Sequence, residues 1–298
     1  MADNLAALCE ELALGTYRHG PYERFSVCDP KSRIIHKAAV RDRLIHHAVY
    51  RVLYPFFDHR FMADSFSCRV GKGTHRALDR YRAMARKASC NHTRTCWILK
   101  CDIRKFFASI DHRILLGVLE KAVSEAKTTA LLRDIVESFS TDSRPGVGLP
   151  LGNLTSQLFA NVYMNEFDQF VKHRLKTRHY IRYADDFAFL SEDRQFLAVL
   201  LPRITSFLYD DLRLEMHPDK VFIRSFASGV DFLGWIHFPD HRVPRSATRR
   251  RMFRRLGEHP TDETLQSYLG LLKHGNARRL EGEIKNLRWI CDFEFSRR

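Results

Sequence analysis

Tyr180-Ile-Arg-Tyr-Ala-Asp-Asp-Phe-Ala-Phe-Leu190 is the stretch of sequence that decides the fold. Two adjacent carboxylates, Asp185 and Asp186, lie between two short apolar, aromatic-rich runs, which are typical of β-strands. Aspartate is unfavourable within a strand and favourable in a turn, so the stretch predicts a β-hairpin with Ala184-Asp185-Asp186 at or beside its tip. Like charges so close together raise each other's pKa unless a cation joins them. A hard cation such as Mg²⁺ would remove the conflict, and a solvated hairpin tip is the alternative.

Length and composition describe a soluble globular protein. The chain has 298 residues, 45% hydrophobic and 28% charged, enough for one or two domains. No apolar run is long enough for a transmembrane helix, and the N-terminus lacks the pattern of a signal peptide. The seven cysteines are scattered without a C-x-x-C pair, which indicates reduced thiols. We therefore expect a cytoplasmic protein with no membrane partner.

The charge of the chain points to a polyanionic partner. The formal net charge is +14, and residues 241–298 carry 14 Lys/Arg against 7 Asp/Glu, half of the excess on about a fifth of the chain. A basic segment concentrated at one end favours contact with nucleic-acid phosphates over a merely solubilising face. The expected backbone contacts are the arginines of one helical run: Arg249, Arg250, Arg251, Arg254 and Arg255.

Periodicity and turn residues predict an ordered series of elements. The first half contains helices over 3–14 and 41–54, the second of them ended by Pro55, and strands around 25–27 and over 31–37. A glycine-punctuated basic loop over 68–75 precedes a helix that Thr74 caps. The second half contains a Gly/Pro-rich turn over 146–152, a long helix over 153–176 with Asn153 or Thr155 as N-cap, a helix over 194–211, strands over 220–224 and 232–236, and helices over 264–272 and 277–290.

A third carboxylate follows a buried strand. Trp97-Ile-Leu-Lys-Cys-Asp102 ends in an aspartate that a rigid element aims, as a metal ligand must be, whereas Asp111 is the expected N-cap of the next helix. Carboxylates on a strand end and on a hairpin are the arrangement with which polymerases and nucleases hold two metal ions for phosphoryl transfer.

Five sequence motifs of this chain, called boxes below, together resemble those of reverse transcriptases. Tyr183-Ala184-Asp185-Asp186 is similar to the Y-x-D-D box, and the other boxes follow in the family's order over residues 17 to 290. They are Lys100-Cys-Asp102-Ile-Arg-Lys-Phe-Phe107 with Ser109-Ile-Asp-His112, Gly148-Leu-Pro-Leu-Gly152-Asn-Leu-Thr-Ser-Gln157, His217-Pro-Asp-Lys220 and Phe232-Leu-Gly-Trp235.

The palm-helix box points to one subfamily. Leu151-Gly152-Asn-Leu-Thr-Ser156-Gln157 stands where most bacterial reverse transcriptases have Q-G-x-x-x-S-P. This variant resembles reverse transcriptases of diversity-generating retroelements, as do Tyr17-Arg-His-Gly-Pro-Tyr22 and Gly71-Lys-Gly-Thr-His75. The resemblance implies an enzyme that copies a template-repeat RNA into cDNA with errors opposite adenine, to diversify a target gene.

The resemblance also implies roles for single residues. Asp102, Asp185 and Asp186 hold two Mg²⁺ ions (or Mn²⁺), with Asp102 and Asp185 as the main ligands and Ile103 beside them. Lys220 protonates the leaving pyrophosphate, and Phe107 crowds a ribose 2′-hydroxyl. The remaining assignments are Arg33 and Arg69, ahead of Arg41, at the triphosphate, Leu151 and Gly152 at the incoming nucleotide, and Phe232, Leu233, Gly234 and Trp235 in the primer grip.

We therefore expect an α+β right-hand polymerase. Residues 1–95 form the N-terminal helix and fingers, 96–240 the palm with an antiparallel sheet and helices, and 241–298 a basic helical thumb. The expected partners are template RNA, the RNA/cDNA duplex, dNTPs and a small basic helical accessory protein that forms a pentameric barrel.

Three alternatives stay open. A retron, intron-derived or phage-defence reverse transcriptase would keep the enzyme without the mutagenic role, although no maturase-like extension follows Arg298. A nucleic-acid-binding scaffold on an inactive polymerase fold is disfavoured by the three intact aspartates. A metal-dependent nuclease would leave Phe107, the primer grip and the thumb without a role.

Overall fold

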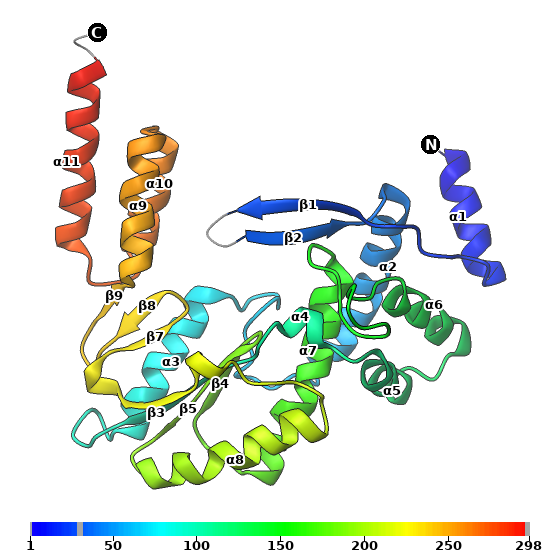
Figure 1. Cartoon of the computed structure of the whole chain (residues 1–298), viewed down its shortest axis with the longest axis horizontal. Helices are drawn as coiled ribbons and strands as arrows, with labels where there is room; N and C mark the ends of the chain where they lie inside the picture. Colours follow the sequence, from blue (N-terminus) through cyan, green and yellow to red (C-terminus); the bar gives the residue numbers. More distant parts are fainter. Residues whose placement is uncertain (1, 29–31, 296–298) are drawn as a thin grey trace. The chain divides into compact units, whose positions relative to one another are not determined.

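The computed structural model describes residues 2–28 and 32–295, which form an α+β protein with antiparallel strand pairs (Figure 1). Pro30 and Lys31, which the sequence places in a loop and at the start of a strand, lie outside these residues. The expected α+β class is confirmed. No helix in the described ranges has the length and apolar character to cross a membrane.

The chain divides into two units. The first contains residues 1–73, 100–189 and 198–222, and the second contains residues 74–99, 190–197 and 223–298. The division into fingers, palm and thumb stays a prediction. In chain order the helices and strands are α1 Ala2–Leu14, β1 Glu23–Cys28, β2 Ser32–Lys37, α2 Val40–Asp58, α3 Thr74–Ala88, β3 Trp97–Asp102, α4 Phe106–Ser109, α5 His112–Ala122, α6 Ala126–Glu137, α7 Leu154–Gln169, the π-helical turn η1 Phe170–Arg174, β4 Tyr180–Tyr183, β5 Asp186–Ser191, α8 Arg194–Asp210, the 3₁₀ turn η2 Pro218–Lys220, β6 Phe222–Ser225, the 3₁₀ turn η3 Phe226–Ser228, β7 Val230–Phe232, β8 Trp235–His237, β9 Arg242–Pro244, α9 Ser246–Glu258, α10 Asp262–Leu272 and α11 Arg278–Phe295.

The strands form three sheets within the described residues. Strands β1 and β2 make a two-stranded hairpin, a four-stranded sheet has the order β4-β5-β3-β6, and β7, β8 and β9 make a three-stranded sheet. The hairpin predicted around the paired aspartates is confirmed: Tyr183 pairs with Asp186, which leaves Ala184 and Asp185 as a two-residue turn. Ala184 has φ +56°, the left-handed conformation that such tight turns require.

Helix α7 is the buried support of this hairpin. Its residues are apolar or buried on almost every side, as expected of a helix enclosed by other elements. The ring of Phe167 on α7 packs against the rings of Tyr180 (6.0 Å) and Phe187 (5.0 Å) on the two hairpin strands. Rigid aromatic packing of this kind fixes the height of the hairpin turn above the helix.

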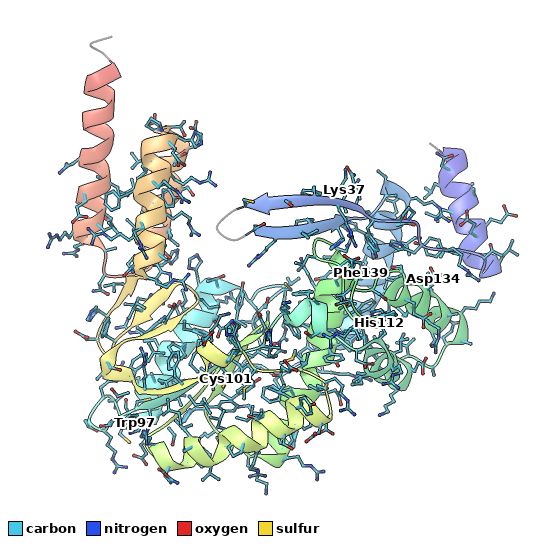
Figure 2. All side chains as sticks on the ribbon, viewed as in Figure 1. Lys37, Trp97, Cys101, His112, Asp134 and Phe139 are labelled. Carbon is cyan, nitrogen blue, oxygen red and sulfur yellow. The ribbon has the colours of Figure 1, made fainter. Side chains whose placement is uncertain are left out.

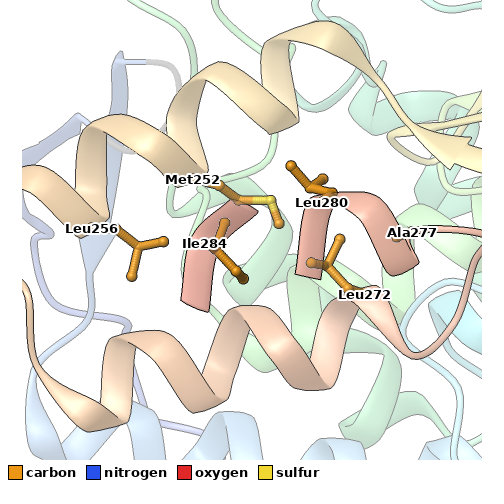
Figure 3. Close-up of a cluster of buried hydrophobic side chains, with 6 residues drawn as sticks. All are labelled: Met252, Leu256, Leu272, Ala277, Leu280 and Ile284. Carbon is orange, nitrogen blue, oxygen red and sulfur yellow. The ribbon is translucent and has the colours of Figure 1, made fainter. Parts of the chain in front are cut away.

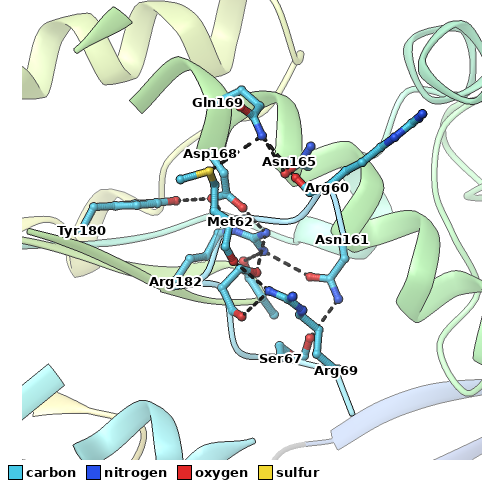
Figure 4. Close-up of polar contacts among 12 residues, drawn as sticks. Arg60, Met62, Ser67, Arg69, Asn161, Asn165, Asp168, Gln169, Tyr180 and Arg182 are labelled. Carbon is cyan, nitrogen blue, oxygen red and sulfur yellow. Dashed lines mark hydrogen bonds and ion pairs between the residues drawn. The ribbon is translucent and has the colours of Figure 1, made fainter. Parts of the chain in front are cut away.

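A buried ion pair ties the hairpin to the same helix (Figure 4). Arg182 on β4 donates from Nε and Nη2 to the carboxylate of Asp168 on α7 at 2.8 and 2.6 Å, and both side chains are fully buried. Tyr180 donates to the same carboxylate at 2.7 Å. Arg182 also donates to Ser65 Oγ (2.9 Å) and to the carbonyl of Ala184 in the turn (3.1 Å). The aspartate-bearing turn is therefore held from below by a satisfied polar network.

Two local predictions were wrong. Pro55 does not end a helix, because α2 continues to Asp58 with Leu53 and Phe57 buried. Burial of these side chains stabilises the last turn more than the missing backbone hydrogen bond at Pro55 destabilises it. Residues 232–236 are not one strand, since Leu233 (φ +52°) and Gly234 (φ +84°) form a turn between β7 and β8. This turn matches the hairpin that the resemblance implied there.

In the second unit, α9, α10 and α11 pack around a small apolar core (Figure 3). The predicted helical C-terminal segment is therefore confirmed. Arg250 and Arg254 lie on the exposed side of α9, whereas Arg249 pairs with Glu283 on α11 at 2.8 Å. The buried side chains are Met252, Leu256, Leu272, Ala277, Leu280 and Ile284.

Candidate active site

Three aspartates from two strand ends converge in the first unit. Asp102 ends β3, and Asp185 and Asp186 form the turn and the first residue of β5. The two segments are joined directly, because the backbone N–H of Ile103 donates to the carbonyl of Asp185 at 3.2 Å. The predicted carboxylate cluster is thus built on rigid backbone, as a site for charge-dependent chemistry must be.

The carboxylates lie in an environment that opposes their charge. Burial raises the pKa of Asp186 to about 6, and the negative charges of Asp102 and Asp185 act in the same direction. Burial, followed by the charge of Asp102, also raises the pKa of Asp185. A site that destabilises its own anions is a site that favours cations.

Lys100 is the first internal cation of this site. It is buried in β3 and forms an ion pair with Asp186. Lys100 had no predicted role, although a signal was present: it stands two residues before Asp102 in a strand, so both side chains face the same side of the sheet. A lysine in an otherwise apolar buried strand indicates a charged partner.

Lys220 is the second cation of this site, and it is partly exposed. It ends the short turn η2 and donates from Nζ to Oδ1 of Asp102 at 2.7 Å. The backbone places it there, since the N–H of His217 donates to the carbonyl of Asp102 at 2.8 Å. The lysine box is therefore in direct contact with the box that contains Asp102, and its role at the reacting phosphates stays a prediction.

The donor chemistry suits Mg²⁺ or Mn²⁺, both of which prefer carboxylate oxygens. In the described part of the chain, however, no three acidic, histidine or cysteine side chains are close enough together to hold a metal ion. Two of the carboxylates are instead paired with lysines: Asp186 with Lys100 and Asp102 with Lys220. Ile103 can contribute only its backbone carbonyl, since its side chain is a buried hydrocarbon.

Comparison with known proteins decides the family. Residues 29–237 match the family model described as reverse transcriptase (RNA-dependent DNA polymerase). The chain belongs to the reverse transcriptase family. It is an RNA-directed DNA polymerase.

Intron-encoded proteins and telomerases are among the similar proteins. Protein YkfC of Escherichia coli (strain K12) is 25% identical, over 95% of this chain and 82% of its own length. The group II intron-encoded protein LtrA of Lactococcus lactis subsp. cremoris is 22% identical over 84% of this chain, which spans about half (51%) of LtrA. Apo telomerase from Candida tropicalis, truncated from its C-terminal domain, shares the fold with a TM-score of 0.57 and 11% identity, over 78% of this chain and 57% of the telomerase chain.

In this reverse transcriptase the palm-helix box, which begins at Gly148, lies against Phe107, the residue predicted to crowd a ribose 2′-hydroxyl. Phe107 is half-buried in α4, and its carbonyl accepts from the N–H of Leu149 at 2.7 Å. His112, labelled in Figure 2, is buried and its Nε2 lies 2.7 Å from the carbonyl of Gly148. These bonds place Leu151 and Gly152 at the end of a segment that is fixed next to Phe107.

The three arginines predicted to contact a triphosphate make different contacts. Arg33 is exposed on β2, where a side chain is accessible to a substrate. Arg69 is buried in its own loop and donates to Asp58 Oδ1 and to the carbonyls of Asp58, Met62 and Ser65. Its predicted contact with a triphosphate would require the release of these partners. Arg41 likewise pairs with Glu11 and Asp42.

The predicted grip and thumb residues all belong to the second unit. Phe232 and Trp235 are buried and form the pair that closes the β7–β8 turn of Leu233 and Gly234. A Cβ at Gly275, in the loop between α10 and α11, would overlap the ring of Trp235, so the grip and the helical segment pack closely. Arg249, Arg250 and Arg254 are exposed, whereas Arg251 and Arg255 are half-buried.

Proposed function

We propose that this reverse transcriptase serves a diversity-generating retroelement and copies a template-repeat RNA into cDNA with errors opposite adenine. The observation that carries the proposal is Leu151, an apolar side chain at the box position where most bacterial reverse transcriptases have glutamine. Its half-buried side chain lies in the segment fixed beside Phe107, which is where the incoming base pair is expected.

Leu151 provides a physical route to low fidelity. A glutamine at this position can hydrogen-bond to the incoming nucleotide and template base, and leucine cannot. Selection among bases depends on differences in transition-state binding, so the loss of a polar contact reduces the penalty for a wrong pair. Packing alone distinguishes shapes by only about 1–3 kcal/mol.

The chemistry follows from the carboxylate site. We infer that Asp102 and Asp185 would be the main ligands of two divalent ions, which when bound would activate the primer 3′-hydroxyl and stabilise charge at the triphosphate. Lys100 holds Asp186, and Lys220 keeps its ammonium beside Asp102, in place to protonate the leaving pyrophosphate. Phe107 excludes a ribose 2′-hydroxyl, and Arg33 contacts the triphosphate.

The partners follow from charge and from the similar proteins. A telomerase structure from Candida tropicalis, solved in complex with a fragment of telomeric RNA, has the same fold (TM-score 0.54). The exposed arginines of α9 and the primer-grip turn would hold an RNA/cDNA duplex, and the accessory protein of the retroelement would bind elsewhere. These assignments are proposals that rest on the net charge of +14 and on the resemblance.

The test is primer extension on an RNA template with Mg²⁺ and dNTPs, with the products sequenced. We expect extension with errors concentrated opposite adenine, reduced errors in Leu151→Gln, and no extension by the Asp185→Ala/Asp186→Ala enzyme. The assay is run with and without an accessory protein encoded next to the enzyme.

Two results would overturn parts of the proposal. Faithful extension by the unaltered chain would favour a retron, defence or intron-type enzyme, which the similarity to LtrA also permits. An unchanged error spectrum in Leu151→Gln would remove Leu151 from the account of fidelity.

A further inference from the structure

The start of α7 contains two residues that are well suited to cap a helix and do not cap it. Asn153 occupies the N-cap position with extended backbone, yet its side chain makes no capping hydrogen bond. Asparagine is among the best N-cap residues because its side chain accepts from the free N–H groups of the first turn. A buried asparagine that makes no such bond is held for another contact.

That contact is with the β1–β2 hairpin. Asn153 Nδ2 donates to the carbonyl of His36 on β2 at 2.9 Å, and Asn153 is only 4% exposed. The N–H of the same His36 donates to the carbonyl of Leu151 at 2.9 Å. Both backbone groups of one residue on β2 are therefore bound by the box that contains Leu151 and Gly152.

Packing reinforces the two bonds. Gly152 has φ +108°, and a Cβ built there would lie 2.7 Å from Cγ2 of Ile35. No other residue would allow so close an approach in that backbone conformation. On the other side of the strand, the ring of His36 lies 4.6 Å from that of Phe139, which follows α6 in the chain and is labelled in Figure 2.

A second bond follows on the same helix. Oγ1 of Thr155 lies 2.7 Å from Nδ1 of His46 on α2, and both residues are buried. Burial, aided by the neighbouring His19, lowers the pKa of His46 to about 4, so the ring is neutral at pH 7. The first turn of α7 is thus joined to the hairpin and to the helix that follows it.

We propose that Asn153 is a positioning residue that latches the β1–β2 hairpin to the palm-helix box and thereby sets the distance between Arg33 and the incoming nucleotide. Side chains alternate along a strand, so Arg33 and Ile35 face the same side of β2, about 7 Å apart. Fixing Ile35 against Gly152 fixes the reach of Arg33. The inference rests on the proposed contact between Arg33 and the triphosphate, and not on the mutagenic role.

The variants Asn153→Ser and Asn153→Ala separate a latch from a cap. Serine is a good N-cap but is too short to reach His36 in the same way, so it preserves the start of the helix and removes the latch. Asn165→Ala is the matched control, because Asn165 lies on the same helix and its side chain bonds only to Gln169 among the contacts that the structure shows. Each variant is assayed for dNTP incorporation at saturating primer–template and for hydrogen exchange without substrate.

We expect both Asn153 variants to raise the KM for dNTPs about 3- to 10-fold, with kcat within about twofold of the unaltered enzyme, as the loss of one buried hydrogen bond allows. Exchange should increase in residues 23–28 and 32–37 and stay unchanged in residues 154–169 for the serine variant. The latch is refuted if Asn153→Ser behaves like Asn165→Ala. It is also refuted if serine restores what alanine loses, because that result would assign Asn153 an ordinary capping role.

Discussion

Two sets of ion pairs lie on opposite sides of the aspartate-bearing turn, and they are built differently. Arg182 and Asp168 are fully buried, and the guanidinium also bonds to Ser65 and Ala184. Lys220 pairs with Asp102 through one Nζ, and its side chain is 42% exposed. The bidentate pair is fixed in one geometry, whereas a flexible lysine can leave its carboxylate to a competing cation. The first pair fixes the turn in place, and we propose that the lysine occupies its carboxylate only until substrate and metal bind.

The largest expected effect is on the buried set. Arg182→Met should lower the free energy of unfolding by about 3–5 kcal/mol, because it leaves Asp168 buried without its cation. Chemical denaturation monitored by circular dichroism measures the change. Arg24→Met, which breaks an exposed pair with Asp142, is the control and should cause no measurable loss. A double variant with Asp168→Leu should recover part of the stability. Equal losses in Arg182→Met and Arg24→Met would contradict the contrast between the two sets.

The second prediction concerns pH. The pKa of Asp186 is about 6 in the folded state, against 3.8 as its ordinary value, so the folded chain binds this proton more tightly than the unfolded chain does. The resulting stability is fully present below pH 3.8 and is lost as the pH rises through 6. Relative to Asp186→Asn, the unaltered protein in EDTA should lose about 3 kcal/mol across this window. Asp211→Asn, at an exposed position, should follow the unaltered protein. A constant difference between pH 4 and pH 8 would show that burial does not disfavour the Asp186 charge.

The third prediction tests Lys220 in turnover. Lys220→Ala should slow single-turnover incorporation about 10²-fold if its ammonium protonates pyrophosphate, the lower end of what general acids contribute. Lys220→Arg keeps the charge but is a poor proton donor, so it should remain nearly as slow. An arginine variant that restores the rate would show that only the positive charge beside Asp102 matters.

The sequence predicted the turn and its charges better than it predicted their partners. The Asp185-Asp186 hairpin, the strand that ends at Asp102 and the basic C-terminal helices follow from local periodicity and turn preference, and the structure has all three. Pro55 and residues 232–236 were mispredicted because tertiary packing and two left-handed residues decided them. The pairing of Lys100 with Asp186 joins residues 86 positions apart, and no local pattern specifies it.

Asn153 is a second example of a contact that the local sequence does not specify. Its residue type correctly indicated the start of α7, and its side chain nevertheless bonds to His36 on a strand 117 positions earlier. A capping preference is a property of the local chain, whereas the choice between a cap and a distant carbonyl depends on which elements pack there. The positions of Asp102, Asp185 and Asp186 were therefore predictable from the local sequence, and the contacts that support them were not.

The smallest expected effect tests whether Lys100 competes with a metal ion for Asp186 or keeps Asp186 ionised and in place. If Lys100 only occupies Asp186 until metal binds, Lys100→Met removes a positive charge from the site and should strengthen Mn²⁺ binding at pH 8 by a factor of roughly ten or less, since each nearby charge acts through a high effective dielectric. Titration calorimetry of the substrate-free protein measures the affinity, with Lys121→Met, at an exposed position on α5, as the control. Weaker Mn²⁺ binding in Lys100→Met would reverse the argument: the ammonium would then be what keeps Asp186 ionised and in place, and the contrast between a permanent and an exchangeable set of ion pairs would hold for Lys220 alone.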